Sequence, residues 1–114
     1  MTNKHIFLPL QEPTLFILLS LRGGEKHGYA ILKEVALLSD ERVKLSTGTL
    51  YGALYRLQDQ GYIERIESKD GARGKKVYRL TRSGVEVFDA EVGRMKQLLL
   101  AVKERVHAEG GQQV

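Results

Sequence analysis

STGTLYGALYRLQDQG, residues 46–61, has the pattern of a helix of about four turns. Its apolar positions recur at the spacing that stacks side chains on one helical face, namely Leu50, Leu54 and Leu57. Ser46 or Thr47 suits the N-cap, and Gly61 suits the end of the helix because glycine enters the left-handed conformation without a Cβ clash. We therefore predict a helix that buries its leucine face.

The opposite face of this predicted helix is slender and polar. Gly48 and Gly52 lie nearly opposite the leucines, and each costs the helix about 1 kcal/mol relative to alanine. In exchange, they allow another surface to approach the backbone closely. The first two turns hold hydroxyls and no acid, so their free N–H groups favour an anion. These features suit a DNA groove, although an ordinary surface helix with two tolerated glycines has the same pattern.

The composition is that of one small globular domain with a mildly basic charge. The chain has 114 residues, of which 42% are hydrophobic and 28% charged, and its net charge is +4. It has no cysteine, which excludes disulfides, thiol nucleophiles and zinc–thiolate sites. The longest apolar run, Leu15–Leu19, is far below the ~18 residues of a membrane span, and the N-terminus does not resemble a signal peptide. We predict a cytoplasmic protein with no membrane partner.

No pattern of a catalytic centre is present. His5, His27 and His107 lie far apart and lack metal-ligand spacing such as HExxH. No serine lies in a G-x-S-x-G motif. Residues 23–28 have the end spacing of a phosphate loop but lack the Lys-Ser/Thr pair that must follow. We therefore predict no enzyme activity, no metal site and no cofactor.

Two further helices are predicted before residue 46. The first begins with Pro13 at the N1 position, and Leu15–Leu21 is apolar except for one serine. This pattern predicts a helix that is buried all round, either at the centre of the core or shared with a second subunit. The second continues to about Ser39, with an apolar stripe at Ile31, Leu32, Val35 and Leu38. Residues 40–45 are predicted to form a linker in which Val43 and Leu45 turn toward the core. Helix, break and helix form a helix-turn-helix arrangement.

A basic β-hairpin is predicted after these helices. Residues 62–67 and 76–80 are enriched in β-branched and aromatic side chains, and 68–75 form a turn-rich loop. The region from Arg65 to Arg82 holds seven basic residues and two acids. A hairpin after a helix-turn-helix makes a winged helix, whose basic tip suits DNA phosphates. The alternative is that these basic side chains are simply solvated.

The last predicted helix has Thr81 as N-cap and continues to about Val106. Its apolar residues follow an unbroken a/d heptad pattern at Val85, Phe88, Val92, Met95, Leu99, Val102 and Val106. A helix of roughly 25 residues is ~38 Å long, which exceeds what a domain of this size can cover. We therefore predict a homodimer whose interface includes Phe88, Val92, Met95, Leu99, Val102 and Val106.

The predicted fold class is mainly α with a small β-hairpin, that is, a winged helix-turn-helix followed by a long C-terminal dimerisation helix. We divide the chain into a DNA-binding domain at 1–80, a dimerisation helix at 81–107 and a frayed tail at 108–114.

Several short motifs together resemble the PadR family of bacterial transcriptional regulators. They are HGYAI at 27–31, GTLY at 48–51 with Leu54, Arg56 and Leu57, GYI at 61–63, and YRLT at 78–81 before Gly84. The match covers about residues 15–106, and the single C-terminal helix resembles the shorter branch of the family. A departure is Gly52, where the family often carries proline, which affects the path or rigidity of the recognition helix.

The resemblance implies a winged helix-turn-helix dimer that binds a pseudo-palindromic operator, usually as a repressor. Carried to this sequence, it implies DNA contacts by Lys26, His27, Thr47, Thr49, Tyr51, Lys69, Arg73, Lys75 and Lys76. Tyr51 also flanks the leucine face and is a candidate for partial burial. A capping or packing role for His27 is an equal alternative.

We therefore expect a sequence-specific DNA-binding regulator that acts as a homodimer on double-stranded DNA. A small-molecule effector is possible and unidentified. Neither the operator, the half-site spacing, the regulated genes nor the direction of regulation follows from the sequence. The competing hypothesis is a winged-helix protein-interaction module that does not bind DNA.

Overall fold

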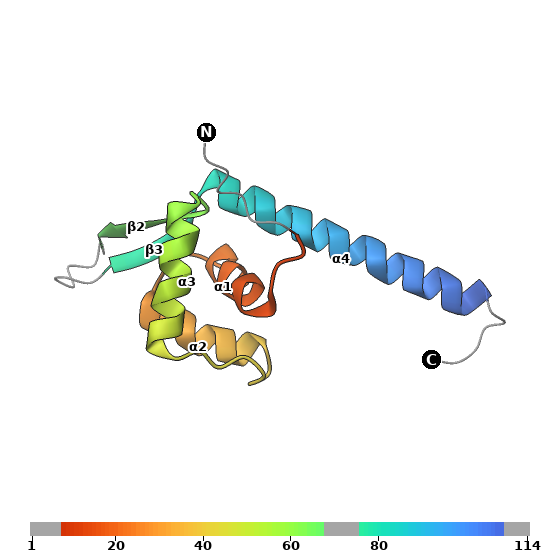
Figure 1. Cartoon of the computed structure of the whole chain (residues 1–114), viewed down its shortest axis with the longest axis horizontal. Coiled ribbons are helices and arrows are strands. Elements are labelled where there is room, and N and C mark those ends of the chain that lie inside the picture. Colours follow the sequence, from red (N-terminus) through yellow and green to blue (C-terminus); the bar gives the residue numbers. More distant parts are fainter. Residues whose placement is uncertain (1–7, 68–75, 109–114) are drawn as a thin grey trace.

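Four helices and three short strands make up the described part of the chain (Figure 1). The structure is a computed structural model that describes residues 8–67 and 76–108. The elements are α1 (Glu12–Arg22), β1 (Lys26–His27), α2 (Gly28–Leu38), α3 (Thr47–Asp59), β2 (Ile63–Glu67), β3 (Lys76–Leu80) and α4 (Arg82–Ala108). Helices α1 to α3 gather beside the small sheet, whereas α4 extends far beyond them. The predicted fold, mainly α with a small antiparallel sheet, is confirmed.

Both ends of α3 are capped as the sequence predicts. The Ser46 hydroxyl accepts a hydrogen bond from the Thr49 N–H at 3.1 Å. At the other end Gly61 has φ +84°, and the N–H of Tyr62 donates to the carbonyl of Leu57 at 2.9 Å. This is the Schellman arrangement, which satisfies carbonyls at the helix end. Helix α3 also passes through Gly52 without a break.

Helix α1 lies at the centre of the core. Ile17 and Leu18 are fully buried, and the helix contacts α2, β3 and α4. It begins with Glu12, so Pro13 occupies the second helical position rather than the predicted first. The predicted central place in the core is confirmed, although burial on every side is not complete in a single chain, because Leu15, Phe16 and Leu19 stay partly exposed.

Helix α2 buries only the first part of its predicted stripe. Ile31 and Val35 are fully buried, but Leu38 is 42% exposed because the helix ends there and the chain turns away. In the linker that follows, Val43 and Leu45 pack against the core, as predicted.

The sheet has three antiparallel strands in the order β1-β3-β2 rather than the predicted two. In β2 and β3, Arg65 pairs with Tyr78 and Glu64 with Arg79. The additional strand, β1, places Lys26 opposite Tyr78 and His27 opposite Val77. Two residues are too few to show a period, so the sequence placed them at the start of the second helix instead. The basic loop predicted at 68–75 lies outside the described residues.

Helix α4 begins on the core and ends away from it. The Thr81 hydroxyl accepts a hydrogen bond from the Gly84 N–H at 3.1 Å, which confirms the predicted N-cap. Phe88 is 8% exposed and belongs to the core of its own chain. Its ring is therefore mostly covered by its own chain, and its predicted place in a dimer interface stays a prediction. Beyond the core, Leu98 to Leu100 and Val102 are each more than half exposed.

A buried carboxylate joins α4 to the segment before α1. Glu91 is 1% exposed, and its side chain accepts a hydrogen bond from the Leu10 N–H at 3.0 Å. Arg94 donates two more hydrogen bonds, at 2.6 and 2.9 Å. These Arg94 hydrogen bonds, with that from Leu10, lower the pKa of Glu91 against the opposing effect of burial. The ionised carboxylate is thus part of the folded structure.

Candidate nucleic-acid interface

The outward face of α3 is open to an approaching surface. Thr47, Gly48 and Thr49 are exposed, and a Cβ placed on Gly48 would meet no atom within 4 Å. A Cβ on Gly52 would meet only the Arg56 guanidinium, at an ordinary 3.6 Å. Within the described residues, a Cβ at either position would clash with nothing. Each glycine therefore lowers the stability of the helix without allowing closer packing inside the chain. This is the arrangement predicted for close approach of an external partner.

The first turn of α3 is partly satisfied by its cap. The Ser46 hydroxyl accepts from the Thr49 N–H and donates to the Thr49 hydroxyl at 2.9 Å. The Thr49 hydroxyl oxygen is thereby held in place with its own O–H left to donate outward. No acidic residue lies in this turn, so its dipole faces solvent uncompensated.

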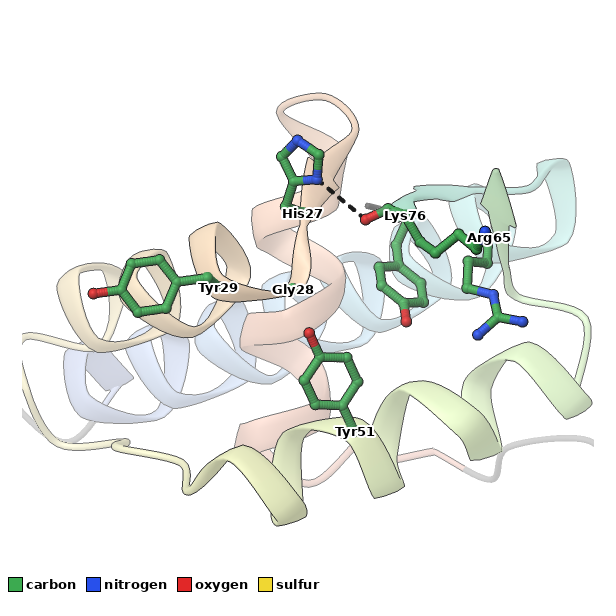
Figure 2. A pocket seen from close by; sticks show the side chains of 7 residues that line it. His27, Gly28, Tyr29, Tyr51, Arg65 and Lys76 are labelled. Atoms are coloured by element: carbon green, nitrogen blue, oxygen red, sulfur yellow. Dashed lines mark hydrogen bonds between the residues drawn. The ribbon is translucent and has the colours of Figure 1, made fainter. Parts of the chain in front are cut away.

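Tyr51 points sideways from α3 toward the start of α2 (Figure 2). It is 44% exposed, so the predicted partial burial is observed. Its ring meets Tyr78 edge-on, with centroids 6.5 Å apart. A Cβ on Gly28 would lie only 2.2 Å from the Tyr51 hydroxyl, so this glycine gives the phenol its place against the backbone.

A hollow of about 390 Å³ lies between α3, the start of α2 and the sheet. Its lining residues are His27, Gly28, Tyr29, Tyr51, Arg65, Lys76 and Tyr78. Figure 2 shows Tyr51 reaching toward Gly28 and Arg65 reaching in from β2, while Tyr29 points away along α2. None of the lining residues is acidic, so the hollow favours an anion.

Lys26 has an internal role. Its ammonium donates to the Ser20 carbonyl at 2.7 Å and to the Gly24 carbonyl at 3.2 Å, and it pairs with Glu34 at 3.3 Å. Its side chain is 19% exposed. These contacts compete with the phosphate contact that the family resemblance implied for Lys26.

His27 joins two strands. Its Nδ1 lies 3.2 Å from the Lys76 carbonyl, as the dashed line in Figure 2 shows. Since a carbonyl only accepts, Nδ1 carries the hydrogen in this bond. His27 thus has a structural contact within the chain, while its DNA contact stays a prediction.

Of the predicted wing residues, Lys76 alone is described, and its ammonium pairs with Glu67. Lys69, Arg73 and Lys75 lie outside the described residues. Sequence reasoning did not select Arg65 or Tyr78 as site residues. Strand alternation could have placed each on one face of its strand, but it could not show which face turns toward α3.

The fold and this surface define the chain as a winged helix-turn-helix protein with an extended C-terminal helix. It belongs to the PadR-like family of transcriptional regulators, whose family model matches residues 17–90. The family consists of transcriptional regulators rather than enzymes.

Solved structures share this fold at moderate identity. A transcriptional regulator from Clostridium thermocellum is 25% identical over 80% of this chain and 86% of its own, with a TM-score of 0.66. PadR of Bacillus subtilis in complex with operator DNA is 28% identical over 72% of this chain and 47% of its own, with a TM-score of 0.63. RosR of H. salinarum is 27% identical over 89% of this chain and 90% of its own, with a TM-score of 0.62.

A curated relative is an uncharacterized 37.1 kDa protein in transposon TN4556 of Streptomyces fradiae. It is 34% identical over 87 residues, which are 76% of this chain and 24% of the relative. The chain therefore spans about a quarter of the length of that relative.

No group of histidine, aspartate and glutamate side chains in residues 8–67 and 76–108 is arranged to hold a metal ion. Within the same residues, no helix is both long and apolar enough to cross a membrane.

Proposed function

We propose that this chain is a sequence-specific DNA-binding regulator. In this proposal it acts in the cytoplasm as a homodimer that represses transcription from a pseudo-palindromic operator. The observation that carries the proposal is the exposed glycine face of α3. Gly48 leaves the backbone bare on the side away from the core, and Gly52, partly exposed beside the Arg56 guanidinium, adds no side chain of its own there, so a duplex can approach. The B. subtilis protein that shares the fold was solved with operator DNA, which supports the same ligand here.

In this proposal α3 lies in the major groove. Thr47 and Thr49 contact the DNA from its first turn, and Tyr51 contacts it from the second. Lys69, Arg73, Lys75 and Lys76 supply phosphate contacts from the wing, on the evidence of their charge and position in the sequence. Lys26 is left out because two backbone carbonyls and Glu34 hold its ammonium and its side chain is only 19% exposed, whereas Lys76, paired with the exposed Glu67, keeps 37% of its side chain exposed.

The homodimer is proposed to form through the exposed half of α4. Its outer part presents Leu98, Leu99 and Val102 with more than half of each side chain exposed. A continuous apolar stripe of this kind on a helix is stabilised by a second copy of the same stripe. We place Val92, Met95 and Val106 at the margins of this interface, since they are only partly exposed.

Two-fold symmetry then places two copies of α3 in successive major grooves, about one helical turn apart. Repression follows because bound dimer occludes the promoter. A small-molecule effector would act by changing the separation of the two copies of α3, which shifts the population of binding-competent dimers.

A substitution at Gly48 tests the proposal directly. Gly48→Leu adds a side chain where the chain itself has open space, so the variant should fold at least as well as the wild type. We expect it to lose specific DNA binding, because the new side chain occupies the space needed by the groove. Gly93→Leu is the control, since Gly93 is an equally open helical glycine far along α4.

The measurement is fluorescence anisotropy on duplexes tiled from the DNA upstream of the gene, over a series of salt concentrations. Tight binding to one tile, with affinity falling steeply as salt rises, supports the proposal. If Gly48→Leu bound the duplex as tightly as the wild type, the glycine face of α3 would not be part of the DNA interface. No binding of wild type to any duplex at low salt would favour the protein-interaction module instead.

A further inference from the structure

The hollow between α3 and the sheet gathers hydrogen-bond donors that the described residues do not use. Tyr78 lines it and is 5% exposed, so more than nine-tenths of the residue is buried. Within residues 8–67 and 76–108, its hydroxyl has no hydrogen-bond partner. No buried side-chain oxygen or nitrogen among the described residues lacks a partner, so the Tyr78 ring is buried while its hydroxyl opens into the hollow. The hydroxyl is therefore available to a ligand bound there.

A second donor set comes from the start of α2. No side chain caps this helix at His27, and its first turn contains no acid. The positive end of an 11-residue helix therefore faces the hollow without a local counter-charge. The Tyr51 hydroxyl lies against the same turn, at Gly28.

Arg65 supplies a charge without an ion-pair partner among the described residues. The neighbouring cations of the sheet differ: Arg79 pairs with Glu64 at 2.7 Å, and Lys76 pairs with Glu67. Arg65 lies opposite Tyr78 in the strand register, so both side chains belong to the face of the sheet that lines the hollow. The Tyr78 phenol, the Arg65 guanidinium and the N-terminus of α2 thus all line the same hollow.

We propose that this hollow is a subsite for one phosphodiester group of the DNA backbone. The Tyr78 and Tyr51 hydroxyls donate to its oxygens, Arg65 neutralises its charge, and the first turn of α2 contributes its dipole. The subsite adjoins α3, so the phosphate it holds fixes the depth and register at which α3 reads the bases. The inference rests on the proposed DNA-binding function and adds a specific contact to it.

Tyr78→Phe is the central variant because it removes one oxygen atom and keeps the ring. The hydroxyl has no partner within the described chain, so the thermal midpoint of unfolding should not fall. We expect binding to a duplex to weaken by about tenfold per subunit, the value of one hydrogen bond to a charged acceptor. An unchanged affinity would overturn the proposal.

Arg65→Gln tests the charge, with Arg79→Gln as its matched control on the opposite face of the same sheet. Loss of one phosphate contact should reduce the slope of log affinity against log salt by about 0.9 per subunit for Arg65→Gln. Arg79→Gln should leave the slope nearly unchanged, because the Arg79 charge is already paired with Glu64. Equal slopes for the two variants would overturn the assignment.

A duplex with single methylphosphonate substitutions identifies the phosphate. At one position in each half-site, the neutral linkage should weaken the wild type and remove the difference between wild type and Tyr78→Phe. A difference that persists at every position would refute the subsite. If wild type binds no duplex, the proposed function fails first, and this inference fails with it.

Titration with inorganic phosphate, followed by NMR of the tyrosine rings, separates a DNA subsite from a site for a free anion. Weak binding that competes with DNA supports the proposal. Binding of free phosphate that Tyr78→Phe abolishes, with DNA affinity unchanged by the same variant, would overturn the assignment to DNA.

Discussion

Gly84→Ala should severely destabilise the protein, because α4 crosses the turn before β2 without room for a side chain. A Cβ on Gly84 would lie 2.0 Å from the carbonyl oxygen of Tyr62 and 3.2 Å from Leu80 Cδ2. The first contact is with backbone, which cannot rotate away as a side chain can. The start of α4 must therefore move by more than 1 Å, roughly the shortfall from an ordinary van der Waals contact.

That movement breaks the contacts that join α4 to the turn. The Thr81 N–H donates to the Tyr62 carbonyl at 3.1 Å, and the Thr81 hydroxyl donates to the Gly61 carbonyl at 2.6 Å. Losing both costs about 2 kcal/mol, and overpacking adds about 1–3 kcal/mol. Alanine recovers about 1 kcal/mol through its helix propensity. The expected net loss is about 2–4 kcal/mol, a large part of the stability of a small domain.

The control is Gly93→Ala in the same helix, where a Cβ meets nothing within 4 Å. It receives the same propensity gain without the clash, so it should raise stability by about 0.5–1 kcal/mol. Urea unfolding followed by circular dichroism compares the two at one protein concentration, because the midpoint of a dimer depends on concentration. If Gly84→Ala were as stable as Gly93→Ala, the close approach of α4 to this turn would be refuted.

Three further outcomes are expected. The Arg94 hydrogen bonds lower the pKa of Glu91 in the folded protein. The ionised carboxylate therefore stabilises the fold at pH values above the usual glutamate pKa, and this contribution is lost as the pH falls through the lowered pKa. In thermal unfolding, Glu91→Gln should be less stable than the wild type at neutral pH, and its stability should depend less on acid pH. Leu99→Asp should produce monomers in analytical ultracentrifugation, whereas Leu37→Asp, at a leucine 73% exposed on α2, should not; a dimeric Leu99→Asp would place the interface elsewhere. Glu41 has φ +66°, so Glu41→Gly should raise the free energy of unfolding by about 0.5–1 kcal/mol and shift the urea midpoint to a higher concentration. A lowered midpoint would contradict the strain argument.

Local patterns predicted the elements because their causes lie within a few residues of one another. The leucine spacing and caps of α3 both appear in the structure, as does the Thr81 cap of α4. The sequence also predicted that α4 extends beyond the core, because its heptad pattern is longer than the surface of a small domain. The exposed glycine face of α3 follows from helical geometry alone.

Contacts between distant parts of the chain were not predictable in the same way. Strand β1 is defined only by its pairing with β3, and Glu91 becomes structural only when Leu10 lies beside it. The hollow depends on Tyr51 and Tyr78 meeting across two elements, which no local period encodes.

The sequence by itself therefore determined the helices, the hairpin strands and which face of each is apolar, because hydrophobic period and capping act locally. The tertiary structure alone decided that Lys26 is bound internally, that Phe88 belongs to its own core and that Tyr78 opens onto a hollow. Each of these depends on the relative placement of elements, which is set by packing the whole core at once rather than by neighbours in the chain.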